Sequence, residues 1–345
     1  MHSDLVKAAD LIGVELSALE EASKTSQRLL SQFRQVLKKE FSNNPPDGLE
    51  KTDIVFLGSI AREEASFQSD CDYYVLQHGA PPETTRRLIT SAEKIRETFG
   101  SGQPGGQGVF GNIVVAANLY ESIGLELDSN ANMTRRVLLL SESKPVTEGK
   151  AHAEVIDHIL SRYCADYLPP IRAKSSSAKV PRYLLNDLVR YWRTMAVDFG
   201  TKRWRTGDSH LRLAKLRITR KVLFAGPLAT VLFAEQDIDT NEKLQSYLKK
   251  SLAAPPLAQI AKHVDSMSQK SQKAMKILLQ NYDQFIGILS GDKREVLKGI
   301  KGDSKSQEEL REQCRKIGDK IQSSLEQIFF EDPLLKKSFR KYSVF

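Results

Sequence analysis

The sequence predicts an α+β fold, in which a mixed β-sheet with helices is followed by a mainly α-helical domain. Three observations lead to this fold class. Short apolar runs bounded by turn residues, which are typical of buried strands, occur only before residue 145. From about residue 150 onward, apolar residues recur at helical spacing with few interruptions. The chain has 345 residues, 40% of them hydrophobic, which is enough for two domains with separate cores.

The expected elements follow from this periodicity and from the turn residues between them. In chain order they are one or two helices (5–42), a strand (53–58), a helix start (59–66), a strand (71–76), a helix (81–99), a glycine-rich loop (100–111), a third strand (112–120), a helix (130–143) and, near the end, a charged helix (303–330). We therefore expect a first domain over 1–145 that includes the N-terminal helix, a helical domain over 146–330 and a basic C-terminal tail over 331–345.

The composition narrows the class of protein. The three cysteines, Cys71, Cys164 and Cys314, are odd in number and far apart, which argues against a disulfide framework and against a CxxC zinc site. No apolar run reaches the roughly 18 residues of a membrane span, and the N-terminus lacks the pattern of a secretory signal. We expect a cytoplasmic protein that is not itself a membrane protein.

Positive charge is concentrated in one part of the chain. The formal net charge is +8, and residues 171–221 contain fourteen Lys and Arg against three Asp. Such a block suits a polyanion, either a nucleotide triphosphate or a nucleic acid. A solvated helix face is the alternative interpretation.

The stretch over 53–76 carries the most informative motif. Asp70 and Asp72 are two residues apart at a strand, so their carboxylates are expected on one face, where a cation would relieve their repulsion. Hard oxygen ligands predict Mg²⁺, as two ions, with Mn²⁺ as the alternative. Gly58 and Ser59 open a helix whose free N–H groups favour a phosphate. Together these residues predict a site for a nucleotide triphosphate and its metals.

This arrangement resembles the polymerase-β-like nucleotidyltransferase superfamily. Its signature is Gly-Ser, an Arg a few residues later and then Asp-x-Asp, and the corresponding residues are Gly58, Ser59, Arg62, Asp70 and Asp72. The resemblance implies Mg²⁺-dependent transfer of a nucleotidyl group to a hydroxyl, with pyrophosphate leaving. The alternative interpretation is an ordinary turn followed by an acidic strand start.

The resemblance also implies a third carboxylate, which joins the other two as a metal ligand on the acceptor side. Glu121, Glu126 and Asp128 are the candidates. Related bacterial proteins identified as signal-protein uridylyltransferases carry a similar acidic residue just before a helix, which favours Asp128 as the third catalytic and metal-binding residue. Glu126 remains open because it would share a strand face with Asp128, and a helix N-cap is the structural alternative for Asp128.

The segments 185–199 and 211–224 resemble the helical domain that accompanies this catalytic domain in the same bacterial group. The resemblance implies a nucleotide-binding role for polar residues of these helices. The candidates are Asn186, Arg190, Arg193, Lys215 and Lys221. Tyr191 and Trp192 are expected in the core rather than as base-stacking platforms.

Most of the chain resembles the nucleotidyltransferase of Hailong-type bacterial anti-phage systems. That resemblance implies synthesis of a single-stranded oligonucleotide signal from (d)NTP, dATP or ATP, without a template. It also implies a membrane effector encoded nearby as a partner, and priming on a tyrosine near the C-terminus, here Tyr342. For the tail, the alternative is that Phe339, Tyr342 and Phe345 dock it onto the helical domain.

Two other functions stay open at this point. One is a toxin-like or regulatory nucleotidyltransferase that modifies tRNA or a protein. The other is a non-catalytic nucleotide-binding module, against which the intact Gly58-Ser59 and the pair Asp70 and Asp72 argue.

Overall fold

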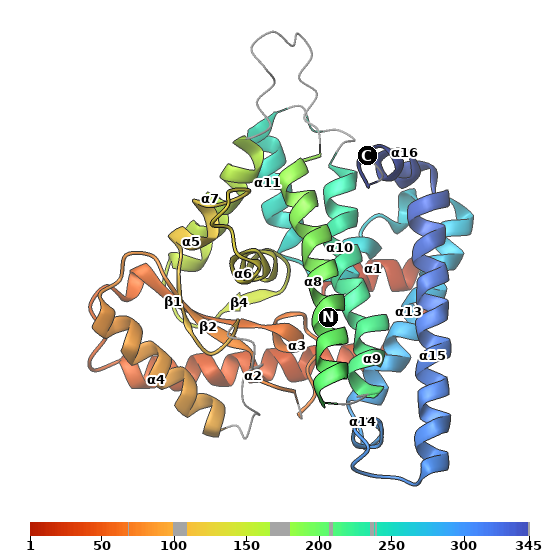
Figure 1. Ribbon diagram of the computed structural model, residues 1–345, viewed down its shortest axis with the longest axis horizontal. Helices are drawn as coiled ribbons and strands as arrows, with labels where there is room; N and C mark the ends of the chain where they lie inside the picture. Colours follow the sequence, from red (N-terminus) through yellow and green to blue (C-terminus); the bar gives the residue numbers. More distant parts are fainter. Residues whose placement is uncertain are drawn as a thin grey trace. The chain divides into compact units, whose positions relative to one another are not determined.

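The computed structural model describes residues 1–343 except 68, 99–108, 166–179, 207–209, 235–237 and 239. The chain divides into two units made of discontinuous segments (Figure 1). Unit 1 consists of Met1–Ala22, Ser177–Asp239 and Ala254–Phe345, and unit 2 of Ser23–Ser176 and Thr240–Ala253. The fold is mixed α+β, as expected, and mostly helical.

The boundary expected at residue 145 falls inside unit 2, where the turn that follows this residue is bonded to the sheet. Asp53 is fully buried, and its carboxylate accepts hydrogen bonds from the Thr147 hydroxyl at 2.7 Å and from the backbone N–H groups of Gly149 and His152 at 3.1 and 2.8 Å. Such bonds offset the cost of burying the carboxylate. The helix α7 (Ala151–Ala165) therefore belongs to unit 2.

The sheet of unit 2 has four strands in the order β3-β2-β1-β4. They are β1 (Thr52–Leu57), β2 (Tyr73–Gln77), β3 (Ile113–Val115) and β4 (Ser143–Pro145). The central strand β1 is antiparallel to both of its neighbours, whereas β2 and β3 are parallel. The register places Val55 opposite Tyr74 and Phe56 opposite Tyr73, so the two faces of the sheet alternate along both strands.

Helices cover both faces of this sheet (Figure 1). On one face, α2 (Ser17–Phe41) and α4 (Pro82–Thr98) pack on Ile54, Phe56, Tyr73 and Val75 to form an apolar core. On the other face lie α5 (Ala117–Tyr120), α6 (Asn130–Ser141) and α7. The candidate site described below lies next to this second face of the sheet.

Unit 1 is helical throughout its described residues. Its elements are α1 (Ser3–Ile12), α8 (Arg182–Thr206), α9 (His210–Arg217), α10 (Thr219–Phe233), α12 (Pro256–Ala261), α13 (Gln269–Leu289), α14 (Lys293–Leu297), α15 (Ser304–Glu326), a π-helical turn η3 (Gln327–Glu331) and α16 (Pro333–Ser343). The helix α11 (Asn241–Leu252) belongs to unit 2. Within the described part of the chain, none of the helices has the length and apolar character that a membrane span requires.

Three elements differ from the sequence-based expectation. The helix after the first strand, α3 (Gly58–Ala61), has only four residues. The third strand ends at Val115 and is followed by the short helix α5. The segment expected as a short basic tail contains a helix, α16, whose apolar residues Leu335 and Phe339 pack against other residues of unit 1. Most of the expected glycine-rich loop lies outside the described residues.

Candidate active site

The contact between Gly58 and Asp72 is the centre of the candidate site. The backbone N–H of Leu57 donates to the carbonyl oxygen of Asp72 at 2.9 Å, so the pairing of β1 with β2 extends one residue beyond β2. Gly58 is buried and has a φ of 68°, and a Cβ atom there would lie 3.2 Å from the Asp72 Oδ2 atom. Only glycine combines this left-handed conformation with such a close approach.

The two aspartates of the Asp-x-Asp motif lie just before the first residue of β2. Because β2 begins at Tyr73, Asp72 adjoins the strand, while Asp70 lies in the loop before it. Asp70 is exposed and Asp72 is half-buried. The shared-face argument from strand alternation therefore holds for Asp72 and Tyr74, but it does not extend to Asp70.

We expect Gly58→Ala to lower activity of this site about 10- to 100-fold, because displacing a reacting group by less than 1 Å has effects of this size. Gly299→Ala is a matched control: Gly299 also has a positive φ, 76°, but a Cβ there would meet nothing within 4 Å. Each substitution should cost about 1–2 kcal/mol of stability through the backbone alone. Steady-state rates and thermal melts of both variants would separate the two effects. Equal losses of activity in both would refute the role given to the contact.

Arg62 lies between two buried carboxylates that come from different parts of unit 2. Its Nε donates to Glu64 at 2.8 Å, and its guanidinium also pairs with Glu142, which follows α6. Burial raises the pKa of Glu142, the charges of Asp72 and Glu64 raise it further, and Arg62 opposes this shift. Arg62 was expected to bind nucleotide. In the structure its guanidinium forms ion pairs with these two glutamates.

The chain turns sharply between α3 and this cluster. Glu63 has a φ of 63° and is the one described residue other than glycine with a positive φ. Its carboxylate accepts a hydrogen bond from the Ser23 hydroxyl at 2.9 Å, and the Ala65 N–H donates to the Ser26 hydroxyl at 3.0 Å. These bonds from α2 hold the turn in a conformation that is costly for a residue with a side chain.

Sequence reasoning missed Glu142, Glu64 and Tyr74. Tyr74 follows Asp72 on the same face of β2, and its hydroxyl is buried with no hydrogen-bond partner in the described part of the chain. Burial raises its pKa, which keeps the hydroxyl protonated. Period-2 alternation from Asp72 could have drawn attention to Tyr74. No local pattern indicated Glu142, because it lies 70 residues further along the chain.

Asp128 forms a buried ion pair with Arg136. Its two carboxylate oxygens accept from the Arg136 Nη1 and Nη2 atoms at 3.0 and 2.8 Å, and both side chains are at most 1% exposed. Arg136 also donates to the Tyr163 hydroxyl at 2.6 Å. Among the described residues, no group of three acidic, histidine or cysteine side chains is arranged to hold a metal ion.

The structure also places the two alternatives considered for Asp128, which are a role as helix N-cap and its replacement by Glu126 as the third carboxylate. The N-cap of α6 is Ser129, whose side chain accepts from the Asn132 N–H, so Asp128 is not the helix cap. Glu126 is exposed in the turn before it. The geometry therefore gives Asp128 a structural partner, Arg136.

The candidates from the helical segments all belong to unit 1. Asn186 and Arg193 are exposed on α8, and Arg190 pairs with the buried Asp187 at 3.1 Å. Lys215 is half-buried on α9. Tyr191 is buried, as expected for a core residue. Trp192 stacks on Phe224 with ring centroids 5.6 Å apart.

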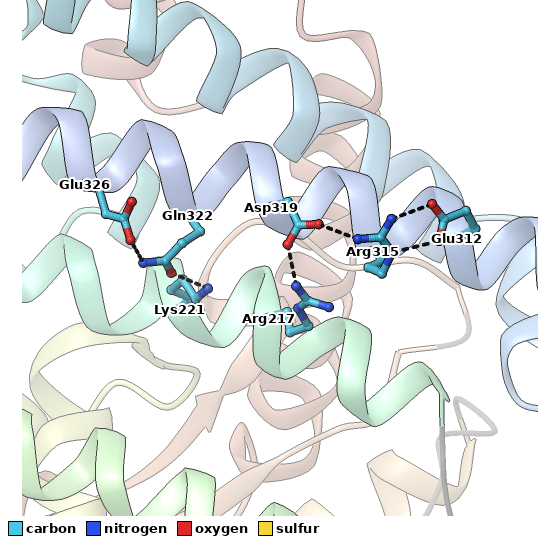
Figure 2. A network of polar contacts seen from close by, with 7 residues as sticks. All are labelled: Arg217, Lys221, Glu312, Arg315, Asp319, Gln322 and Glu326. Carbon is cyan, nitrogen blue, oxygen red and sulfur yellow. Dashed lines mark hydrogen bonds and ion pairs between the residues drawn. The ribbon is translucent and has the colours of Figure 1, made fainter.

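Lys221 faces α15 instead of open solvent (Figure 2). Its Nζ donates to the Gln322 Oε1 at 2.6 Å, and Gln322 in turn donates to Glu326 at 2.6 Å. One turn away, Arg217 pairs with Asp319 at 2.6 Å. Burial lowers the pKa of Lys221 and the Arg217 charge lowers it further, while Glu326 and Asp319 raise it. The residue expected to reach a triphosphate therefore contacts another helix of its own unit.

The helix α16 packs against the π-helical turn η3 that precedes it. Phe339 makes edge contacts with Phe329 and Phe330, with ring centroids 5.8 and 4.7 Å apart. Tyr342 is half-buried on α16, and the Lys341 ammonium lies 4.7 Å from the centre of its ring. The docking role expected of Phe339 is confirmed, and Phe345 lies outside the described residues.

Comparison with known proteins adds no family. No family model matches the chain, and no curated protein is significantly similar to it.

Proposed function

We propose that this protein is a Mg²⁺-dependent nucleotidyltransferase that acts without a template on (d)NTP. The observation that carries the proposal is the close approach of the Asp72 carboxylate to Gly58, with Asp70 exposed two residues before it. The glycine at the end of one strand allows a carboxylate to come close, and a second carboxylate is two residues away in the sequence. This arrangement suits a metal-bound triphosphate. Further support comes from the order Gly-Ser, Arg, Asp-x-Asp in the sequence.

The residues present fit Mg²⁺. Asp70 and Asp72 supply hard oxygen ligands, and Mg²⁺ in enzymes that act on phosphates is usually held by one or two carboxylates together with waters and substrate oxygens. Nearby, Arg62 offsets only one of the two negative charges of Glu64 and Glu142.

In this proposal each residue has a defined task. Asp70 and Asp72 hold the ion, which when bound lowers the pKa of the acceptor hydroxyl and stabilises the leaving pyrophosphate. Gly58 allows the Asp72 carboxylate to approach the start of α3, and the Ser59 hydroxyl donates a hydrogen bond to the substrate phosphates. Arg62 acts as a positioning residue, because it fixes Glu142 and Glu64 around Asp72. Asn186, Arg190, Arg193 and Lys215 are the proposed residues of the helical segments that bind nucleotide or product.

The proposed product is a single-stranded oligonucleotide signal for anti-phage defence, with dATP or ATP as the substrate. Its proposed target is a membrane effector encoded nearby. Tyr342 is the proposed acceptor of the first nucleotide: the hydroxyl attacks the α-phosphorus, its proton is lost, and pyrophosphate leaves.

The test is to incubate the purified protein with each labelled NTP and dNTP and Mg²⁺, then to analyse the products with and without protease. We expect nucleotide increments on the intact protein by mass spectrometry, mapped to Tyr342 and absent in Tyr342→Phe. Tyr183→Phe is a control at another exposed tyrosine. Free oligonucleotide made equally by Tyr342→Phe would refute self-priming alone. Label transferred to added tRNA or protein would favour the modifying enzyme, and no transfer of any label would refute the proposed function.

A further inference from the structure

The outward face of α16 carries a dense cluster of positive charge, the α16 basic face. Lys336, Lys337, Arg340 and Lys341 lie at positions i, i+1, i+4 and i+5 of the helix, so they share one side. Together with Pro333 they line an open hollow of about 510 Å³. Lys336, Lys337 and Arg340 make no ion pair with any residue in the described ranges. This face is therefore available to an anionic ligand.

The opposite side of α16 is already buried in unit 1. Leu335 is fully buried, Ser338 is 4% exposed, and Phe339 packs against two phenylalanines of η3. A helix that lies in a membrane surface must insert its apolar side into the lipid. Because the apolar side of α16 is occupied, its basic face suits a ligand that is recognised by charge.

One aromatic ring accompanies the basic residues. The centre of the Tyr342 ring lies 4.7 Å from the Lys341 ammonium. Proteins that bind single strands combine a positive track for the phosphates with aromatic rings on which bases stack. From Lys336 to Lys341 the helix rises about 7.5 Å, at about 1.5 Å per residue. In a stacked strand with the rise of B-DNA, about 3.4 Å per nucleotide along the axis, this length spans about two nucleotides.

We propose that the α16 basic face binds the sugar-phosphate backbone of single-stranded nucleic acid. The proposal does not depend on nucleotidyl transfer, because binding is measurable without substrate or metal. In a transferase, the same face would hold the strand that the enzyme makes.

The test measures fluorescence anisotropy of a labelled single-stranded oligothymidylate with the full-length protein, in EDTA and without nucleotides, over a range of KCl. We expect Lys336→Glu/Lys337→Glu/Arg340→Glu to weaken binding at least tenfold. Three lost phosphate contacts should reduce the slope of log K against log salt by about 2, at about 0.7 per contact. The neutral variant with Gln at the same positions should show the same change in slope.

The matched control is Lys270→Glu/Lys273→Glu/Lys305→Glu, which makes the same change in net charge at exposed positions of α13 and α15. It should retain at least a third of the wild-type affinity. Equal losses in the two triple variants would show a general charge effect and overturn the proposal. Tighter binding to duplex DNA or to vesicles of anionic phospholipid than to the single strand would also overturn it.

Discussion

The double variant Asp70→Asn/Asp72→Asn should lose nucleotidyl transfer by about 10³-fold or more. Neutral amides are poor ligands for Mg²⁺, and loss of the ion removes several kcal/mol of transition-state stabilisation. The fold should survive, because Asp70 is exposed, Asp72 is half-buried and asparagine has nearly the same size as aspartate. The melting temperature should therefore change little. Incorporation of labelled nucleotide and thermal melting measure the two quantities.

Asp47→Asn is the control for this variant, since Asp47 is exposed in unit 2. It should retain full activity and stability. Turnover in the double variant above one tenth of the wild-type rate, dependent on Mg²⁺, would mean that the active site lies elsewhere. A double variant that does not fold would contradict the expectation that the fold survives the loss of these two charges.

The second large effect concerns stability rather than catalysis. Asp128→Asn leaves the guanidinium of Arg136, which is fully buried, without its counter-ion. Breaking a buried ion pair by removing one partner costs about 3–5 kcal/mol. At about 2–4 °C per kcal/mol for a unit of this size, we expect the melting temperature to fall by at least about 6 °C. Measured at a temperature where the variant is folded, its rate should change less than tenfold.

Glu126→Gln is the matched control, because Glu126 is exposed two residues from Asp128. It should change neither the melting temperature nor the rate. If Asp128→Asn instead loses several orders of magnitude in rate at unchanged stability, Asp128 is the third metal ligand that the family resemblance implied. If Glu126→Gln does so, the ligand is Glu126.

Local patterns predicted most of the secondary structure. The helices α2, α4, α6 and α15 and the strands β1 and β2 agree with the expected ranges to within a few residues, because hydrophobic periodicity and turn residues act over short stretches of chain. The element boundaries that differ from the expectation depend on contacts with residues far away in the sequence. The helix α16 forms where a basic tail was expected, because Leu335 and Phe339 pack against other residues of unit 1.

By itself, the sequence determined the candidate residues Gly58, Asp70 and Asp72, since the spacing from a strand end through a turn to the next strand places Gly58 and Asp72 side by side. Only the tertiary structure decided which charges are neutralised. Arg62 meets Glu142, which is 80 residues away, and Asp128 meets Arg136 in a site closed by Tyr163. Burial makes such pairs obligatory, because an unpaired charge is costly away from water, and burial is a property of the packed chain.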